Sequence, residues 1–249
     1  MPVLRPVLIL LAVLAAPAAA QTPEIACGAP AELLESEAPL PATEKAMQKG
    51  RLRILVAGSA SVLGLGTSGP GKAWPAQLEA LLEQRHPGLG VEVAVRGGRG
   101  LTATDTEALL LAEQQRNPAQ LVLWQSGTVE AVRGLDLDQL TETLNRGVEQ
   151  LRSASTDVML LDPQFSRFLR ANANVEPYRD AIWLVAAAHG ISVLRRYELM
   201  RFWAETDRVD LERASREMRS VVADRLNACI AEALAALIRH GVAEAGAGR

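Results

Sequence analysis

The sequence predicts one α/β domain, in which helices cover both faces of a parallel β-sheet. From Arg51 onward, short apolar runs that favour strands alternate with longer segments of helical periodicity, as in doubly wound, three-layer folds. The chain has 249 residues, of which 49% are hydrophobic, enough for one sizeable core. It contains no internal repeat and no shift of composition that would indicate a second folded domain.

The alternation gives the expected order of the elements. Strands are predicted at residues 52–57, 91–96, 121–125, 158–161 and 191–194, and helices at 75–84, 105–115, 137–152, 175–189 and 215–239. Pro75 suits a first helical turn, and the segments HPGLG and RNPAQ favour helix ends. Because ligands of such sheets bind beyond the carboxyl ends of the strands, we expect the functional residues in the turns that follow the strands.

The N-terminus has the pattern of a secretory signal peptide over residues 1–20. One Arg precedes an apolar run that ends in Ala18-Ala19-Ala20, and the run is short for a membrane span. We therefore expect cleavage after Ala20, a periplasmic or secreted protein, and no stable membrane span after cleavage; an uncleaved anchor is the alternative. Residues 21–50 are predicted to form an arm, 51–240 the folded domain and 241–249 a flexible tail.

The two cysteines, Cys27 and Cys229, favour one disulfide, because exported proteins fold in an oxidising compartment. The bond would tie the arm to the last helix, and two independent buried thiols are the alternative. The formal charge of −3, with acids and bases interspersed, argues against nucleic-acid binding. The cysteines and the three histidines lack metal-ligand spacing, and no cofactor motif is present, so we expect neither a metal nor a cofactor.

Short motifs follow the predicted strands in a fixed order. They are GSASVLGLGTSGPGKAWPAQLEALL, VAVRGGRG, LVLWQSGTVEAVRGLDLDQL, DVMLLDPQF and LRRYELMRFWAE. Together, from about Arg51 to Ile238, they resemble the blocks of the SGNH/GDSL hydrolases, which are esterases and lipases, and look closest to exported bacterial members. The resemblance implies a flavodoxin-like fold with a five-stranded parallel sheet between helices. It also implies ester hydrolysis by a serine, with a histidine as base, an aspartate that orients it, and an oxyanion site that includes a glycine and an asparagine.

The chain departs from the family pattern at the nucleophile. The attacking serine of the first block corresponds here to Ala60, which has no oxygen to attack with. A shift of register that makes Ser59 or Ser61 the nucleophile is the alternative. The sequence therefore predicts that this turn corresponds to the turn that carries the nucleophile in the family, but with an alanine at the attacking position.

Other family positions depart as well. Val129 stands in place of the oxyanion asparagine, whereas the glycine of the second block is present as Gly100, which has a purely structural explanation as the alternative. Met218 and Val221 stand where the aspartate and histidine belong. The histidines lie elsewhere: His86 ends a helix, His189 precedes a strand away from the site and His240 is expected after the final helix.

These departures favour an exported SGNH/GDSL-family protein that has lost ester hydrolysis. We expect its cleft to bind a ligand or partner in the cell envelope, with an acylated or carbohydrate molecule as the ligand. Arg96, Arg99, Gln125 and Glu130 would make that cleft more charged than an esterase pocket. The alternatives are an active esterase with a shifted serine, and an inert partner of an active paralogue.

Overall fold

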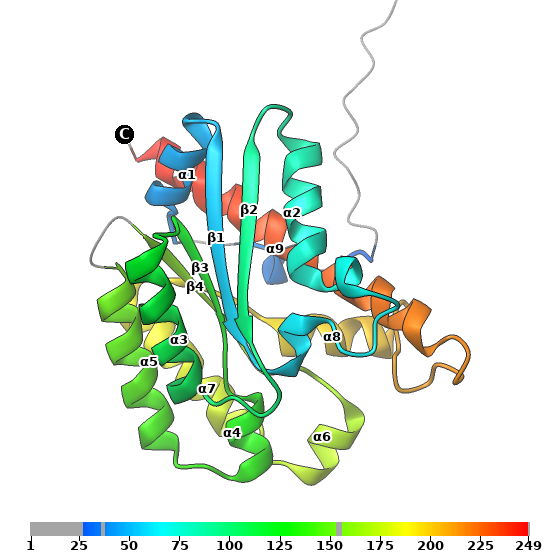
Figure 1. The fold of residues 1–249 in the computed structure, drawn as a ribbon. Helices are drawn as coiled ribbons and strands as arrows, with labels where there is room; N and C mark the ends of the chain where they lie inside the picture. The colour runs from blue at the N-terminus through cyan, green and yellow to red at the C-terminus, as the bar shows by residue number, and fades with distance from the viewer. Residues whose placement is uncertain (1–26, 36–37, 153–155, 249) are drawn as a thin grey trace, which may run out of the picture.

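The computed structural model describes residues 27–35, 38–152 and 156–248 (Figure 1). The predicted signal peptide, residues 1–20, and the first residues of the predicted arm lie outside the described residues. None of the described helices combines the length and the apolar character needed to cross a membrane.

One parallel sheet forms the centre of the molecule. Its order is β2-β1-β3-β4-β5, and its strands are β1 (Arg51–Gly58), β2 (Gly90–Gly97), β3 (Leu121–Gln125), β4 (Asp157–Leu161) and β5 (Ser192–Leu194). Every strand pair is parallel. The predicted five-stranded parallel sheet is therefore confirmed, and each strand begins and ends within one residue of its predicted bounds.

Helices connect the strands and cover the sheet. The α-helices are α1 (Pro41–Gln48), α2 (Trp74–Arg85), α3 (Ala103–Arg116), α4 (Thr128–Arg133), α5 (Leu137–Arg152), α6 (Arg167–Asn172), α7 (Glu176–His189), α8 (Arg196–Glu205) and α9 (Arg219–Ala247). Within the described residues, three short 3₁₀ segments accompany them: η1 (Ala31–Leu33), η2 (Ala60–Leu63) and η3 (Pro70–Lys72).

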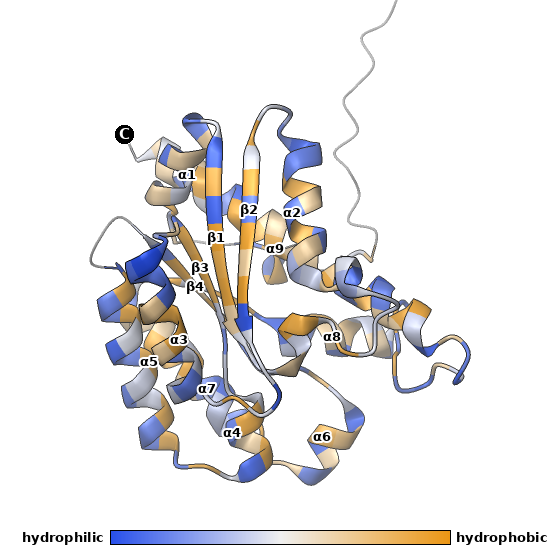
Figure 2. Ribbon diagram, viewed as in Figure 1, coloured by the Kyte–Doolittle hydropathy of each residue, from blue (hydrophilic) through white to orange (hydrophobic). Residues whose placement is uncertain are grey.

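The two faces of the sheet have separate cores because side chains alternate along each strand. On β1, Ile54 and Val56 join the core under α1, α2 and α9, whereas Leu55 and Ala57 join the core under α3, α5 and α7. Figure 1 shows the sheet between helices, and Figure 2 shows that the strands are mostly apolar whereas the helices carry both apolar and hydrophilic residues. The three-layer α/β/α architecture is confirmed.

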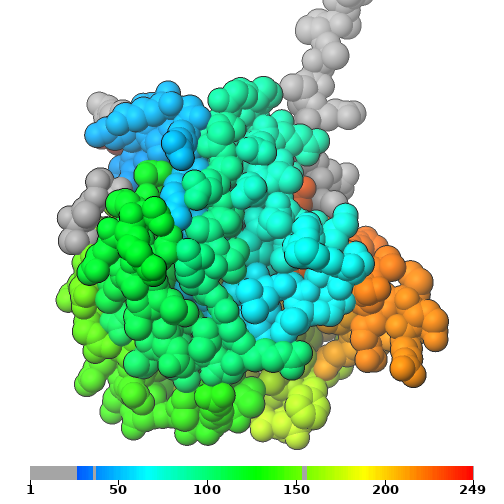
Figure 3. Space-filling view, in the orientation of Figure 1, coloured from blue at the N-terminus to red at the C-terminus, as the bar shows by residue number. Residues whose placement is uncertain are grey.

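The ends of the domain differ from the expectation. The predicted arm contains α1, which packs on α9, and α9 continues to Ala247, so most of the predicted tail is helical. The reason is a close contact between the two ends: Leu40 N donates to Gly241 O at 2.8 Å, and a Cβ on Gly241 would lie 2.6 Å from Leu40 Cγ. The segment between α8 and α9, orange in Figure 3, projects from the rest of the surface.

The predicted disulfide between Cys27 and Cys229 is confirmed, with their Cα atoms 5.7 Å apart. Hydrogen bonds hold the backbone beside it. Arg208 Nη1 donates to Cys27 O, and Trp203 Nε1 donates to Gly28 O, each at 2.8 Å. The start of the described chain is thus fastened both covalently to α9 and by hydrogen bonds to the region of α8.

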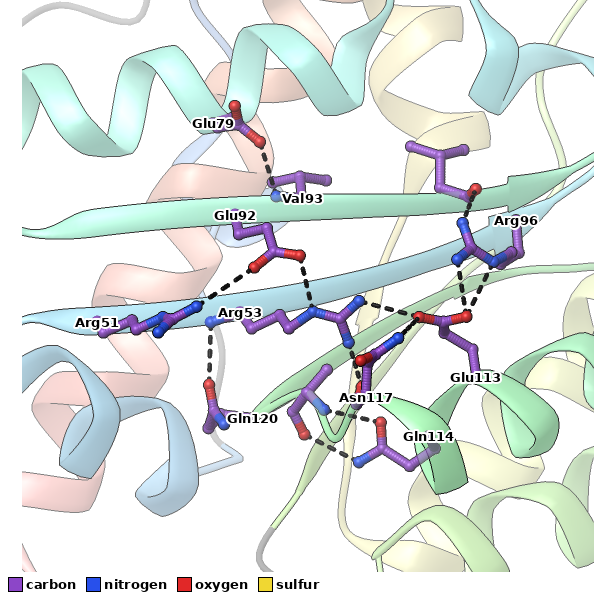
Figure 4. Close-up of polar contacts among 12 residues, drawn as sticks. Arg51, Arg53, Glu79, Glu92, Val93, Arg96, Glu113, Gln114, Asn117 and Gln120 are labelled. Atoms are coloured by element: carbon purple, nitrogen blue, oxygen red, sulfur yellow. Dashed lines mark hydrogen bonds and ion pairs between the residues drawn. The ribbon is translucent and has the colours of Figure 1, made fainter.

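A network of charged side chains links β1 and β2 to α3 (Figure 4). Arg53, on β1, donates to Glu92 Oε1 at 3.0 Å and to Glu113 Oε1 at 2.9 Å, and Arg96 Nη2 donates to Glu113 Oε2 at 2.7 Å. The hydrogen bond from Asn117, together with those from Arg53 and Arg96, lowers the pKa of the Glu113 carboxyl to about 2. Arg96 therefore belongs to a structural network, and the expectation that it charges the cleft is wrong.

We expect Glu113 to make stability depend on pH in the acid range. The pKa of Glu113 is lower in the folded protein than in the unfolded chain. Its contribution to the free energy of unfolding is therefore complete above about pH 4.5 and is lost as pH falls toward about 2. Denaturant unfolding of the wild type and of Glu113→Gln from pH 6 to 2 should therefore show a stability difference that shrinks with acidification. Glu149→Gln, at an exposed helix position, is the control. A stability difference that does not change with pH would contradict the assignment.

Candidate functional site

The carboxyl end of the sheet brings the turn after β1 against the end of β3. A Cβ on Gly58 would lie 2.9 Å from Gln125 Cβ and 2.7 Å from Val62 Cγ1, so only glycine lets these segments approach so closely. The chain then enters η2, whose N-cap is Ser59 and whose first residue is Ala60. Both residues are half-buried.

Three polar side chains from different elements meet beside this turn. Ser61 Oγ donates to Gln125 Oε1 at 2.8 Å. Arg196 Nη1, from the first residue of α8, donates to Ser61 Oγ at 3.1 Å and also to Gln125 Oε1. Arg196 is only 1% exposed, and burial lowers the pKa of its guanidinium to about 10, although the carboxylate of Asp162 opposes that shift. The guanidinium therefore remains charged at neutral pH.

A second buried charge follows β4. Asp162 is fully buried; its Oδ1 accepts from Tyr197 N at 2.9 Å and its Oδ2 from Arg179 Nε at 3.3 Å. Burial raises the pKa of Asp162 to about 6, and the Tyr197 N–H and the two nearby arginines, Arg179 and Arg196, limit the rise. The Arg179 guanidinium also lies 4.3 Å from the centre of the Tyr197 ring.

Glu130 has a structural role at the same end of the sheet. Its Oε1 accepts from Ala103 N at 2.5 Å, and its Oε2 accepts from Gly127 N at 3.0 Å. One buried carboxylate thus satisfies backbone N–H groups where α3 and α4 begin. The expectation that Glu130 contributes charge to an open cleft is wrong.

The structure places one predicted oxyanion position in a loop and the other in a helix. Gly100 lies between β2 and α3 with φ +73°, and a Cβ there would lie 2.6 Å from Arg133 Nη2. The conformation supports the structural explanation for this glycine. Val129 lies in the first turn of α4 and is half-buried.

The two remaining family positions lie at the start of α9. Met218 and Val221 are 49% and 52% exposed. The loop after η2 reaches this helix: Ser68 N donates to Asp224 Oδ1 at 2.8 Å, and Trp74 N donates to Asn227 Oδ1 at 3.0 Å. The first and last family blocks are therefore adjacent in space.

The three histidines of the chain all lie within the described residues, away from this end of the sheet. His86 caps the C-terminus of α2, just before β2. His189 ends α7 before β5 and contacts Asn145 Oδ1 at 2.9 Å. His240 lies inside α9, not after it as expected, beside the residue that bonds Leu40. Since β2 and β5 begin where α2 and α7 end, these imidazoles belong to the opposite end of the sheet.

Sequence reasoning missed Arg196, Asp162 and Arg179. Asp162 precedes Pro163 at the end of a predicted strand, where a turn residue is typical, so the sequence does not indicate its burial. Arg196 follows β5 almost directly, so the rule that ligands bind beyond the carboxyl ends of strands could have singled it out. Nothing in the sequence indicates that its side chain turns inward to meet Ser61.

This architecture, with a Gly-Ser turn after the first strand of a parallel sheet, defines the class of SGNH-type α/β hydrolase folds. The sequence profile of the Non-GDSL lipase-like family matches residues 26–244. The chain belongs to the Non-GDSL lipase-like family, and the predicted relationship to the SGNH/GDSL hydrolases is confirmed.

Solved structures support the same fold. A variant of Axe2, an acetyl-xylooligosaccharide esterase from Geobacillus, is 18% identical with a TM-score of 0.57, covering 78% of this chain and 94% of that chain. The lipase/acylhydrolase from Enterococcus faecalis is 18% identical with a TM-score of 0.56, covering 72% and 94%. At these identities the similarity is one of fold. No curated protein matches the sequence significantly.

Proposed function

We propose that this protein is exported to the periplasm or secreted, does not hydrolyse esters, and uses the carboxyl end of its sheet to bind a ligand or partner in the cell envelope. The observation that carries the proposal is the pairing of Ser61. Its hydroxyl donates to an amide oxygen of Gln125 and accepts from the guanidinium of Arg196. Neither partner is a base that could take the serine proton, so the hydroxyl stays a weak nucleophile.

The family pattern supports the same conclusion. Ala60 occupies the attacking position, and no histidine of the chain lies at this end of the sheet. Loss of one member of a catalytic triad typically lowers turnover by about 10⁴-fold or more. Val129 in place of an asparagine removes a further oxyanion donor.

The ligand class follows from the fold family. Axe2 is an acetyl-xylooligosaccharide esterase, and the similar protein from Enterococcus faecalis is a lipase/acylhydrolase. An acylated or carbohydrate component of the cell envelope is therefore the ligand we propose. An inert partner of an active paralogue would use the same surface.

We expect the purified protein to hydrolyse p-nitrophenyl acetate no faster than buffer, and Ala60→Ser alone to stay inactive because no imidazole is near. The measurement is the initial rate of nitrophenol release. Ser59→Ala and Ser61→Ala serve as matched controls and should behave as the wild type does. Adding Val221→His, Val129→Asn and Met218→Asp to Ala60→Ser should restore detectable turnover, because it rebuilds each family position.

The competing function is an active esterase with a shifted serine. Ser59 and Ser61 are its candidate nucleophiles, since both lie at the expected turn and are half-buried. Wild-type turnover that disappears in Ser61→Ala or Ser59→Ala would establish that function and refute ours.

A further inference from the structure

The Arg196 guanidinium has an unused hydrogen-bonding edge inside the protein. Nη1 is engaged by Ser61 and Gln125. Within the described part of the chain, the buried Nε and Nη2 atoms find no hydrogen-bond partner. These two nitrogens form one side of the planar group, and together they present two parallel N–H donors, the geometry that grips an oxyanion in bidentate fashion.

The charge of this group also lacks a direct partner. Arg196 is fully buried, yet it forms no ion pair with a described carboxylate. Asp162 acts on it only through the electrostatic field, because its two oxygens accept hydrogen bonds from Tyr197 N and Arg179 Nε. A buried charge without a partner is strongly unfavourable. A fully buried arginine with a free donor edge is therefore suited to an anion from outside.

Building on the proposed function, we propose that the ligand of this site carries a carboxylate, which binds to the Nε and Nη2 edge of Arg196. A carboxylate matches the edge in shape and brings a single negative charge to a single guanidinium. A phosphate group would bring nearly two charges and a third oxygen to satisfy. Ser61, which contacts Nη1 of the same guanidinium, is half-buried.

The substitution that tests this proposal is Gln125→Glu. It keeps the size of the side chain and places a carboxylate oxygen where the amide oxygen already accepts from Arg196 and Ser61. The carboxylate introduced at position 125 would neutralise the Arg196 guanidinium, so it should weaken the binding of a carboxylate ligand. Because the two side chains have the same size, the substitution leaves no cavity in the core. Arg196→Gln is a second variant, to be used only if its unfolding remains cooperative.

The measurement is the thermal unfolding midpoint in sodium acetate or sodium glucuronate, with sodium chloride at equal ionic strength as reference. A ligand that binds the folded state raises the midpoint with its concentration. We expect acetate and glucuronate to raise the wild-type midpoint, and Gln125→Glu to weaken the apparent affinity by about tenfold or more. Arg201→Gln, at an exposed arginine of α8 outside the proposed site, controls for general surface binding and should respond as the wild type does.

Three results would overturn the carboxylate site. They are no response of the wild type to either carboxylate, an unchanged response in Gln125→Glu, and a response to sodium phosphate alone. None of these readouts involves ester hydrolysis. An esterase activity would thus refute the proposed function but would not change the outcome of this test. A failed test would refute the carboxylate site but would not show that the protein hydrolyses esters.

Discussion

Replacing both Cys27 and Cys229 with serine is expected to cause one of the largest losses of stability available to this protein. The bond joins residues separated by 202 positions. Constraining so long a loop in the unfolded chain stabilises the folded state by about 5 kcal/mol in the chain-entropy treatment, and native disulfides typically contribute about 2–5 kcal/mol. Denaturant unfolding of the oxidised wild type and of the double variant measures the difference.

A reductant supplies the control for the disulfide. Dithiothreitol should lower the stability of the wild type toward that of the double variant and should leave the double variant unchanged. Both sulfurs are buried, at 3% and 0% exposure for the two cysteines, so reduction is expected to follow partial unfolding. Equal stability of the oxidised wild type and the double variant would show that the bond does not constrain the unfolded chain.

The second large effect is expected for Asp162→Ala. The substitution removes the acceptor of Tyr197 N and of Arg179 Nε and takes away the carboxylate field that acts on Arg196. Removing one partner of a buried ion pair costs about 3–5 kcal/mol, because the remaining charge stays buried without compensation. We expect this loss although burial raises the pKa of Asp162, since the neighbouring donors would remain unsatisfied.

The matched control for Asp162 is Asp180→Ala, which removes an exposed carboxylate from α7. Surface substitutions of this kind typically change stability by no more than about 0.5 kcal/mol. Denaturant unfolding at pH 7 compares the two variants. A loss at position 162 no larger than that at position 180 would mean that the buried charge cluster contributes nothing specific.

Much of the fold could be predicted because its signals are local. The alternation of apolar runs and helical periodicity placed all five strands, and α5 begins and ends where expected, at Leu137–Arg152. Among the helices that were missed, α4 and α6, of 6 residues each, are too short to show a periodic pattern. The helical tail was missed because its stability comes from contact between Gly241 and Leu40, which are distant in sequence.

The sequence by itself determined the order of the strands and the family, and it predicted alanine at 60 and valine at 129 for the family's nucleophile and oxyanion positions. Only the tertiary structure decided what surrounds those positions. Ser61 and Arg196, which meet in the site, are 135 residues apart in the chain. Glu130 binds backbone N–H groups at the starts of two helices, and Arg96 belongs to an ion-pair network with Glu113. Periodicity records which face of an element is buried, but the partner that a buried polar group finds depends on how distant elements pack. For this reason the inward-turned guanidinium, on which the proposed binding site rests, could be seen only in the folded molecule.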